Sequence, residues 1–230
     1  MTKKNVARQP GKSIFWLAVG LVALCLSTAG PPPFTKVAGA HIAPEVGAAA
    51  PSVIDNDADD RALHRAEVKA RWARQWTPPD DMRIDEWGPL ELTNALTIIR
   101  VGCKLGLPPR AHEIAVATAM QESSLLNTAS SAVPESFNYP HQGDSVDSDS
   151  VGLFQQRPSQ GWGAVAQLMD PEYAATKFYE KLGPILARNP GIKLTVAAQA
   201  VQISGYPNAY QKHEPDAVKI VQALEPYCLP

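Results

Sequence analysis

One carboxyl side chain, that of Glu122, has the sequence surroundings that a general acid requires. A helix is predicted from Pro108 to about Ser124, and its Ile114–Met120 stretch is apolar almost all round. Glu122 stands near the C-terminal end of this helix, where apolar neighbours and the helix dipole both raise the pKa of a carboxyl group. A raised pKa allows proton donation near neutral pH. A last-turn glutamate that simply reaches solvent is the alternative.

Two short motifs lie on either side of a polar stretch, Ser130–Ser150, which is predicted to be a long loop. They are Gln121-Glu122-Ser123-Ser124 and Gly152-Leu153-Phe154-Gln155. Together they resemble the Glu-Ser and Gly-Leu-(Met/Phe)-Gln motifs of lytic transglycosylases and goose-type lysozymes. The stretch 149–163, DSVGLFQQRPSQGWG, is more specifically similar to secreted lysozyme-like proteins of actinomycetes. The resemblance extends from about Trp87 to Glu225, although the stretch between the motifs is longer than in common transglycosylases.

The resemblance implies cleavage of the β-1,4 bond between N-acetylmuramic acid and N-acetylglucosamine in peptidoglycan. Glu122 would protonate the glycosidic oxygen, and Ser123 would lie against it and help to orient the substrate. Gly152, Phe154 and Gln155 would line the cleft. In transglycosylases the muramyl 6-hydroxyl then closes an anhydro ring with Glu122 acting as base, whereas in lysozymes water attacks. The sequence does not separate these two routes.

A second catalytic carboxylate would come from the polar loop, because hydrolases of this kind usually use two carboxyl groups. Asp144, Asp147 and Asp149 are the candidates, and Asp149 is the nearest to the Gly-Leu-Phe-Gln motif. We therefore take Asp149 as the second candidate catalytic residue. A solvated acidic loop without a catalytic role is the alternative.

Aromatic side chains beyond the two motifs are candidates for sugar contacts, because Tyr and Trp combine an apolar face with a polar tip. Trp162 stands between two glycines, and the turn Gly205–Tyr210 contains Tyr206, Asn208 and Tyr210. This turn loosely resembles the Tyr-Asn motif that lines the transglycosylase cleft, with Pro207 as an interruption. Packing in the core is the alternative for these side chains.

The beginning of the chain has the charge pattern of an export signal or an N-terminal membrane anchor. Ser13–Ala29 is apolar and uncharged, with Lys and Arg before it and Pro31–Pro33 after it. We therefore expect the rest of the chain to work outside the cytoplasm, either secreted or anchored by this segment. In an oxidising compartment Cys103 and Cys228 are predicted to form a disulfide, with two buried free thiols as the alternative.

We divide the chain into four parts by composition. Residues 1–30 are the signal peptide or anchor, 31–60 a Pro/Ala/Gly-rich linker, 61–84 an exposed helix and spacer, and 85–230 the folded domain. No strand pattern of any length is present, so the domain is predicted to be mainly α, with a small hairpin near the acidic loop. The resemblance implies that this helical domain has the lysozyme-like fold. Its helices are expected over Pro89–Gly106, Pro108–Ser124, Asp170–Leu186, Thr195–Ser204 and Pro215–Leu224.

Composition excludes several other classes of function. The formal net charge of −2 gives no basic footprint for nucleic acid. The five histidines are scattered without a zinc motif, and we expect neither a metal nor a cofactor. We expect a monomer whose partner is the peptidoglycan glycan strand. A non-catalytic wall-binding protein, or a part of a secretion or conjugation apparatus on the same fold, is the alternative.

Overall fold

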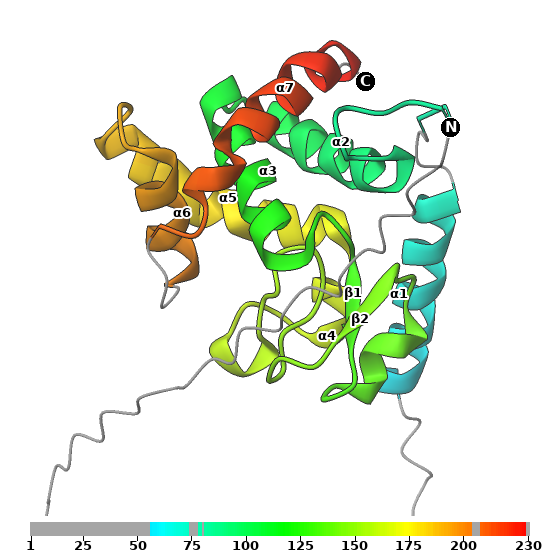
Figure 1. The fold of residues 1–230 in the computed structure, drawn as a ribbon. Helices are drawn as coiled ribbons and strands as arrows, with labels where there is room; N and C mark the ends of the chain where they lie inside the picture. Colours follow the sequence, from blue (N-terminus) through cyan, green and yellow to red (C-terminus); the bar gives the residue numbers. More distant parts are fainter. Residues whose placement is uncertain (1–55, 74–77, 80, 204–207, 229–230) are drawn as a thin grey trace, which may run out of the picture.

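The computed structural model describes residues 56–73, 78–79, 81–203 and 208–228, and these are mostly helical (Figure 1). The predicted signal or anchor and most of the predicted linker lie outside the described residues. The α-helices are α1 (Asn56–Ala73), α2 (Pro89–Lys104), α3 (Pro109–Ser123), α4 (Val165–Leu168), α5 (Pro171–Arg188), α6 (Leu194–Gln202) and α7 (Glu214–Leu224). The 3-10 helices are η1 (Pro134–Asn138), η2 (Pro158–Gln160), η3 (Gln211–His213) and η4 (Glu225–Tyr227), and the strands are β1 (Thr128–Ser130) and β2 (Gly143–Ser145).

Helix α3 is the central element of the helical part. It contacts α2, α5, α6 and α7, which surround it (Figure 1). Its residues from Ile114 to Met120 are buried, because a helix enclosed by four neighbours needs apolar side chains on every face. The mainly α prediction is therefore confirmed, and the all-round apolar pattern is explained by this enclosure.

Proline and capping residues set the helix starts, as the sequence indicated. Pro89, Pro109 and Pro171 each stand at the first helical position, where the missing N–H costs nothing. The Asp170 carboxylate caps α5 by accepting a hydrogen bond of 3.1 Å from the Glu172 N–H. The observed bounds lie close to the predicted ones, and the short α4 and the 3-10 helices are additions that periodicity does not reveal.

The two strands form a parallel pair, so the prediction of a hairpin is wrong. Thr128 is paired with Gly143 and Ser130 with Ser145. A two-residue turn joins only antiparallel strands, whereas a parallel pair needs a connection of roughly a dozen residues. Residues 131–142, which contain η1, provide that connection. Antiparallel pairing occurs nearby only as isolated bridges, one of which joins Val151 to Gln156.

Helix α1 lies alongside the lobe that contains β1, β2 and α4 (Figure 1). The His64 Nε2 atom is 3.4 Å from the carbonyl oxygen of Ala166, and the Arg65 side chain hydrogen-bonds to Tyr139. Many of its described side chains remain exposed, among them Leu63. The predicted helix in the 61–84 segment is therefore present, but it packs on the domain.

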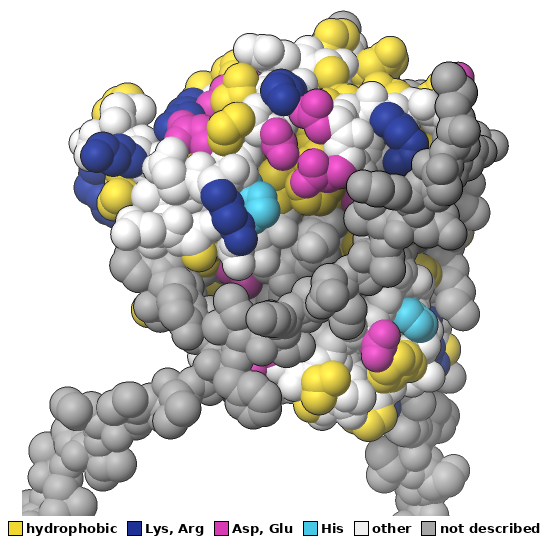
Figure 2. All heavy atoms as spheres, viewed as in Figure 1, with side chains coloured by type: hydrophobic (Ala, Val, Ile, Leu, Met, Phe, Trp, Pro, Cys, Tyr) yellow, Lys and Arg dark blue, Asp and Glu magenta, His cyan; other side chains and the backbone are white. Residues whose placement is uncertain are grey.

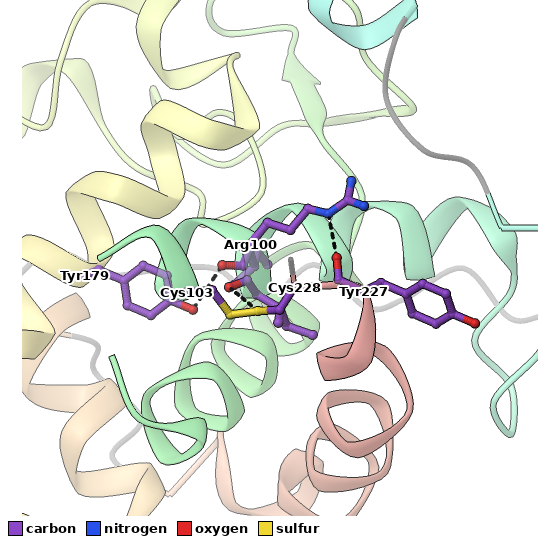
Figure 3. Close-up of a disulfide and its surroundings, with 7 residues drawn as sticks. Arg100, Cys103, Tyr179, Tyr227 and Cys228 are labelled. Carbon is purple, nitrogen blue, oxygen red and sulfur yellow. Dashed lines mark hydrogen bonds between the residues drawn. A yellow bond between two sulfur atoms is a disulfide. The ribbon is translucent and has the colours of Figure 1, made fainter. Parts of the chain in front are cut away.

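Cys103 of α2 and Cys228 after η4 form the predicted disulfide, with their Cα atoms 6.2 Å apart (Figure 3). The C-terminal segment is also fixed by a hydrogen bond of 3.0 Å from Arg100 Nε to the Tyr227 carbonyl oxygen. These contacts hold the end of the chain against the beginning of the folded domain.

No helix among the described residues is long and apolar enough to cross a membrane, and Ser13–Ala29 is not among them. On the face shown in Figure 2, basic and acidic side chains lie close to one another. Ion pairs in the described part of the chain include Lys219 with Asp85 and Arg110 with Glu214.

Candidate active site

The structure places Glu122 in the last turn of α3, where its side chain is half-buried. The hydroxyl of Tyr210, which is fully buried just before η3, donates a hydrogen bond of 2.8 Å to Glu122 Oε1. The sequence pointed to Tyr210 as a sugar contact. It is instead the partner of the candidate acid, and it joins the segment before η3 to the end of α3.

The electrostatic surroundings of Glu122 favour the protonated acid at neutral pH. Desolvation by burial is the largest effect, and it raises the pKa of Glu122 from 4.5 to about 7. Hydrogen bonds from Tyr210 and Gln202 act in the opposite direction, because they favour the carboxylate. The negative charge of Asp147 adds to the increase. The direction agrees with the one expected from the apolar helix, and the value suits a group that must release and regain a proton near pH 7.

Ser123 connects the end of α3 to the second motif. Its hydroxyl lies 2.8 Å from the Leu153 carbonyl oxygen and 3.1 Å from that of Ala119. The expected role for Ser123 was to orient the substrate. Its observed hydrogen bonds are to backbone groups, and they fix the Gly152–Gln155 segment beside Glu122.

Gly152 is required by a close approach of two backbone segments. Its φ of 77° lies in the left-handed region, and a Cβ atom here would clash with the Leu168 carbonyl oxygen. Its N–H donates a hydrogen bond of 2.9 Å to the Thr128 carbonyl oxygen. Gln155 adds a hydrogen bond of 2.7 Å from its amide to the Thr128 hydroxyl. These contacts join the motif to β1.

The Phe154 side chain lies in the core and does not line a surface. It is fully buried and stacks on Phe178 of α5, with the ring centroids 4.8 Å apart. The expectation that Phe154 contacts substrate therefore does not apply to its ring. Its carbonyl oxygen accepts a hydrogen bond of 2.8 Å from Nε2 of Gln202, the last residue of α6.

Asp149, the predicted second catalytic carboxylate, already has two partners. It forms an ion pair with Arg157 and accepts a hydrogen bond of 2.9 Å from the Ser159 N–H. Desolvation acts to raise its pKa, but the hydrogen bonds from Ser159 and Arg157 outweigh it and lower the pKa to about 2. The Asp149 carboxylate is thus ionised across the physiological pH range. Its contacts with Arg157 and Ser159 link the two ends of the 149–159 segment. Asp144 is exposed, whereas Asp147 is half-buried and acts electrostatically on Glu122.

Of the other residues predicted to contact sugar, Trp162 and Asn208 differ in their exposure to solvent. Trp162 is almost fully buried, and the Lys181 ammonium lies 3.1 Å from the centroid of its ring. Asn208 is exposed, and Tyr206 lies outside the described residues. Of the predicted aromatic contacts that the structure describes, it brings only Tyr210 to Glu122.

Strained backbone is concentrated around Glu122 and its partners. Positive φ in a residue other than glycine costs about 1–3 kcal/mol and tends to occur at functional sites. In the described part of the chain, five of the six such residues lie one or two positions after a residue of the site, and Asp85 is the exception. They are Ser124 and Leu125 after Ser123, Ser148 after Asp147, Gln155 after Phe154, and Ile203 after Gln202.

Gln202 is the group at this site that sequence reasoning missed. It ends an ordinary amphipathic helix, and no motif or spacing distinguishes it from other glutamines of the chain. Its relation to Glu122 depends on how the end of α6 packs against the Gly152–Gln155 segment, which is a tertiary contact.

Comparisons with known proteins give no independent assignment, since no protein-family model and no curated protein sequence matches this chain. Among the described residues, no three His, Cys, Asp or Glu side chains are grouped so that they could hold a metal ion. The site therefore has to be interpreted from its own geometry.

Proposed function

We propose that this domain cleaves the glycan strand of peptidoglycan, with Glu122 as the general acid. The observation that carries the proposal is the state of Glu122: a desolvated carboxyl group with a pKa of about 7, hydrogen-bonded by Tyr210 beside the Gly152–Gln155 segment. The resemblance of the two motifs to lytic transglycosylases and goose-type lysozymes supplies the substrate class. The Cys103–Cys228 disulfide supports work outside the cytoplasm, by a secreted or N-terminally anchored protein.

Two neutral side chains hydrogen-bond to the carboxyl group of Glu122. Tyr210 donates to Oε1, and Gln202 hydrogen-bonds to the same carboxyl group, so both hold the acid in place beside the Gly152–Gln155 segment. As the glycosidic C–O bond breaks, the proton passes from the Glu122 carboxyl group to the leaving oxygen. Glu122 then becomes a carboxylate, which Tyr210 and Gln202 stabilise.

The second half of the reaction follows one of two routes. The muramyl 6-hydroxyl attacks the anomeric carbon and returns a proton to Glu122, which gives an anhydro product, or a water molecule attacks and gives a reducing end. Because Asp149 is held by Arg157 and Ser159, we assign it to supporting the 149–159 segment.

The test is mass spectrometry of purified peptidoglycan digested with the protein. Anhydro-muropeptides indicate a transglycosylase, and reducing-end muropeptides indicate a muramidase. Wild-type protein that is folded and binds insoluble wall but releases neither product contradicts the proposal and favours the non-catalytic wall-binding alternative. The variant Glu122→Gln provides the blank, because it keeps the size and polarity of the side chain but holds no acidic proton.

A further inference from the structure

The side-chain amide of Gln202 is held in one orientation by its backbone partner. Its Nε2 donates a hydrogen bond of 2.8 Å to the carbonyl oxygen of Phe154. A carbonyl oxygen only accepts hydrogen bonds, so the amide nitrogen, and not the amide oxygen, must face Phe154. The Gln202 side chain also hydrogen-bonds to the carboxyl group of Glu122, and this contact lowers the pKa of Glu122. The amide therefore approaches Glu122 as a donor.

We propose that Gln202 is a positioning residue that spans from the Phe154 carbonyl oxygen to the Glu122 carboxyl group and presents a fixed hydrogen-bond donor to the acid. This inference deepens the proposed function and rests on it for the role of Glu122 in catalysis. The donor property of Gln202 itself is independent of the substrate.

Further contacts hold both the Phe154 partner and the backbone of Gln202 itself. On one side, the Phe154 ring stacks on Phe178, and the neighbouring Leu153 carbonyl oxygen is hydrogen-bonded by Ser123. On the other side, Ile203 ends α6 with a φ of 53°, and its N–H donates a hydrogen bond of 2.8 Å to the Gln199 carbonyl oxygen. An amide turned with its oxygen toward the Phe154 carbonyl oxygen would lose the hydrogen bond to Phe154, because two acceptors would then face each other.

The surroundings of Glu122 have opposite effects on its pKa. Burial and the charge of Asp147 favour the neutral acid, whereas Tyr210 and Gln202 favour the carboxylate. With both donors present, the carboxyl group gives up its proton to the leaving oxygen and takes one back afterwards at neutral pH. Without Gln202 the acid holds its proton more tightly, so its pKa rises and the protonated form persists to higher pH.

The test is a titration of Glu122 by carbon NMR on the full folded chain without substrate, with the signal assigned by its disappearance in Glu122→Gln. Gln202→Met keeps the length of the side chain but has no donor. We expect it to raise the pKa of Glu122 by about one unit, the equivalent of one hydrogen bond to a buried group. Gln222→Met, an exposed position on α7, is the matched control and is expected to leave the titration unchanged.

A second variant keeps the inference testable if Gln202→Met does not fold. Gln202→Asn retains the amide but is too short to span both partners, so it is expected to raise the pKa of Glu122 as well. Folding of each variant is checked by its thermal transition. An unchanged pKa of Glu122 in a folded variant at this position overturns the inference.

The outcome is separable from that of the proposed function. If the wild-type protein cleaves peptidoglycan, the basic limb of its pH–rate profile is expected to move upward in Gln202→Met by the same shift as the titration. Cleavage with an unmoved titration overturns the role of Gln202 alone. A moved titration in a protein that releases no muropeptides supports the donor role and contradicts the proposed function.

Discussion

The two ends of α3 carry one glutamate each, and their surroundings differ in kind. Glu113, in the N-terminal half, lies 2.8 Å from Arg110, which also binds Glu214 of α7 at 2.7 Å. Glu122, in the last turn, has neutral hydrogen-bond donors and a negative charge nearby, and burial raises its pKa to about 7. The ion pair with Arg110 makes Glu113 part of the scaffold, whereas burial beside neutral donors raises the pKa of Glu122 and provides a reactive acid.

The largest expected effect comes from exchanging each glutamate for its amide. Glu122→Gln is expected to lower the rate of muropeptide release by about 10²–10⁴-fold, because the general acid is lost. Glu113→Gln on the same helix is expected to keep near wild-type activity and to lose some stability, since Arg110 loses one of its two acidic partners among the described residues. Equal losses of activity in the two variants would contradict the assignment of Glu122 as the acid and of Glu113 as a structural residue.

Removal of the disulfide is expected to have the next largest effect. The change concerns stability, and it is made away from Glu122. Cys103 and Cys228 are separated by 125 residues, so the chain-entropy account gives a stabilisation of about 5 kcal/mol. The double variant Cys103→Ser/Cys228→Ser is expected to lower the free energy of unfolding in denaturant by up to this amount. At low temperature its cleavage rate is expected to be close to that of wild type. A stability equal to that of wild type would argue against the covalent link.

The pH dependence of stability tests the state of Glu122 without any substrate. Its pKa is about 7 in the folded protein and near 4.5 when exposed, so the folded state binds the proton more tightly. The stabilisation is fully present below about pH 4.5 and is lost as the pH rises through 7, a change of about 2–3 kcal/mol. Urea unfolding across this range should show the decline in wild type. The same decline in Glu122→Gln would contradict its assignment to this residue.

The smallest effect concerns the end of α6. Ile203 is β-branched, and 84% of its surface is exposed. Its backbone adopts the left-handed conformation, with a φ of 53°. Ile203→Gly is expected to raise the free energy of unfolding by about 1 kcal/mol, because glycine adopts this conformation without a Cβ penalty. The cleavage rate is expected to fall, because a looser helix end holds Gln202 less firmly. Ile203→Val retains the strain, and its stability is expected to match that of wild type.

The helical framework was accessible from the sequence because its determinants are local. Proline at the first helical positions, Asp170 as a cap and the apolar pattern of Ile114–Met120 all act within a few turns. The raised pKa of Glu122 followed from the same local pattern. The disulfide followed from the cysteine count together with an oxidising compartment.

The details of the site were not accessible, because they depend on segments that meet only in the folded chain. Gln202 and Phe154 are 48 residues apart, and Tyr210 and Glu122 are 88 apart. The ion pair of Asp149 with Arg157 competes with a catalytic role that spacing alone suggested. The parallel pairing of β1 and β2 depends on the path of η1, and the strands are too short to leave a periodic signal.

The central claim, that Glu122 acts as the acid, is tested most directly by the pH dependence of muropeptide release by the wild-type protein. A group that must be protonated and has a pKa of about 7 predicts a rate that falls roughly tenfold per unit above pH 7. A cleavage rate that stays constant or increases up to about two units above that pKa would contradict the account.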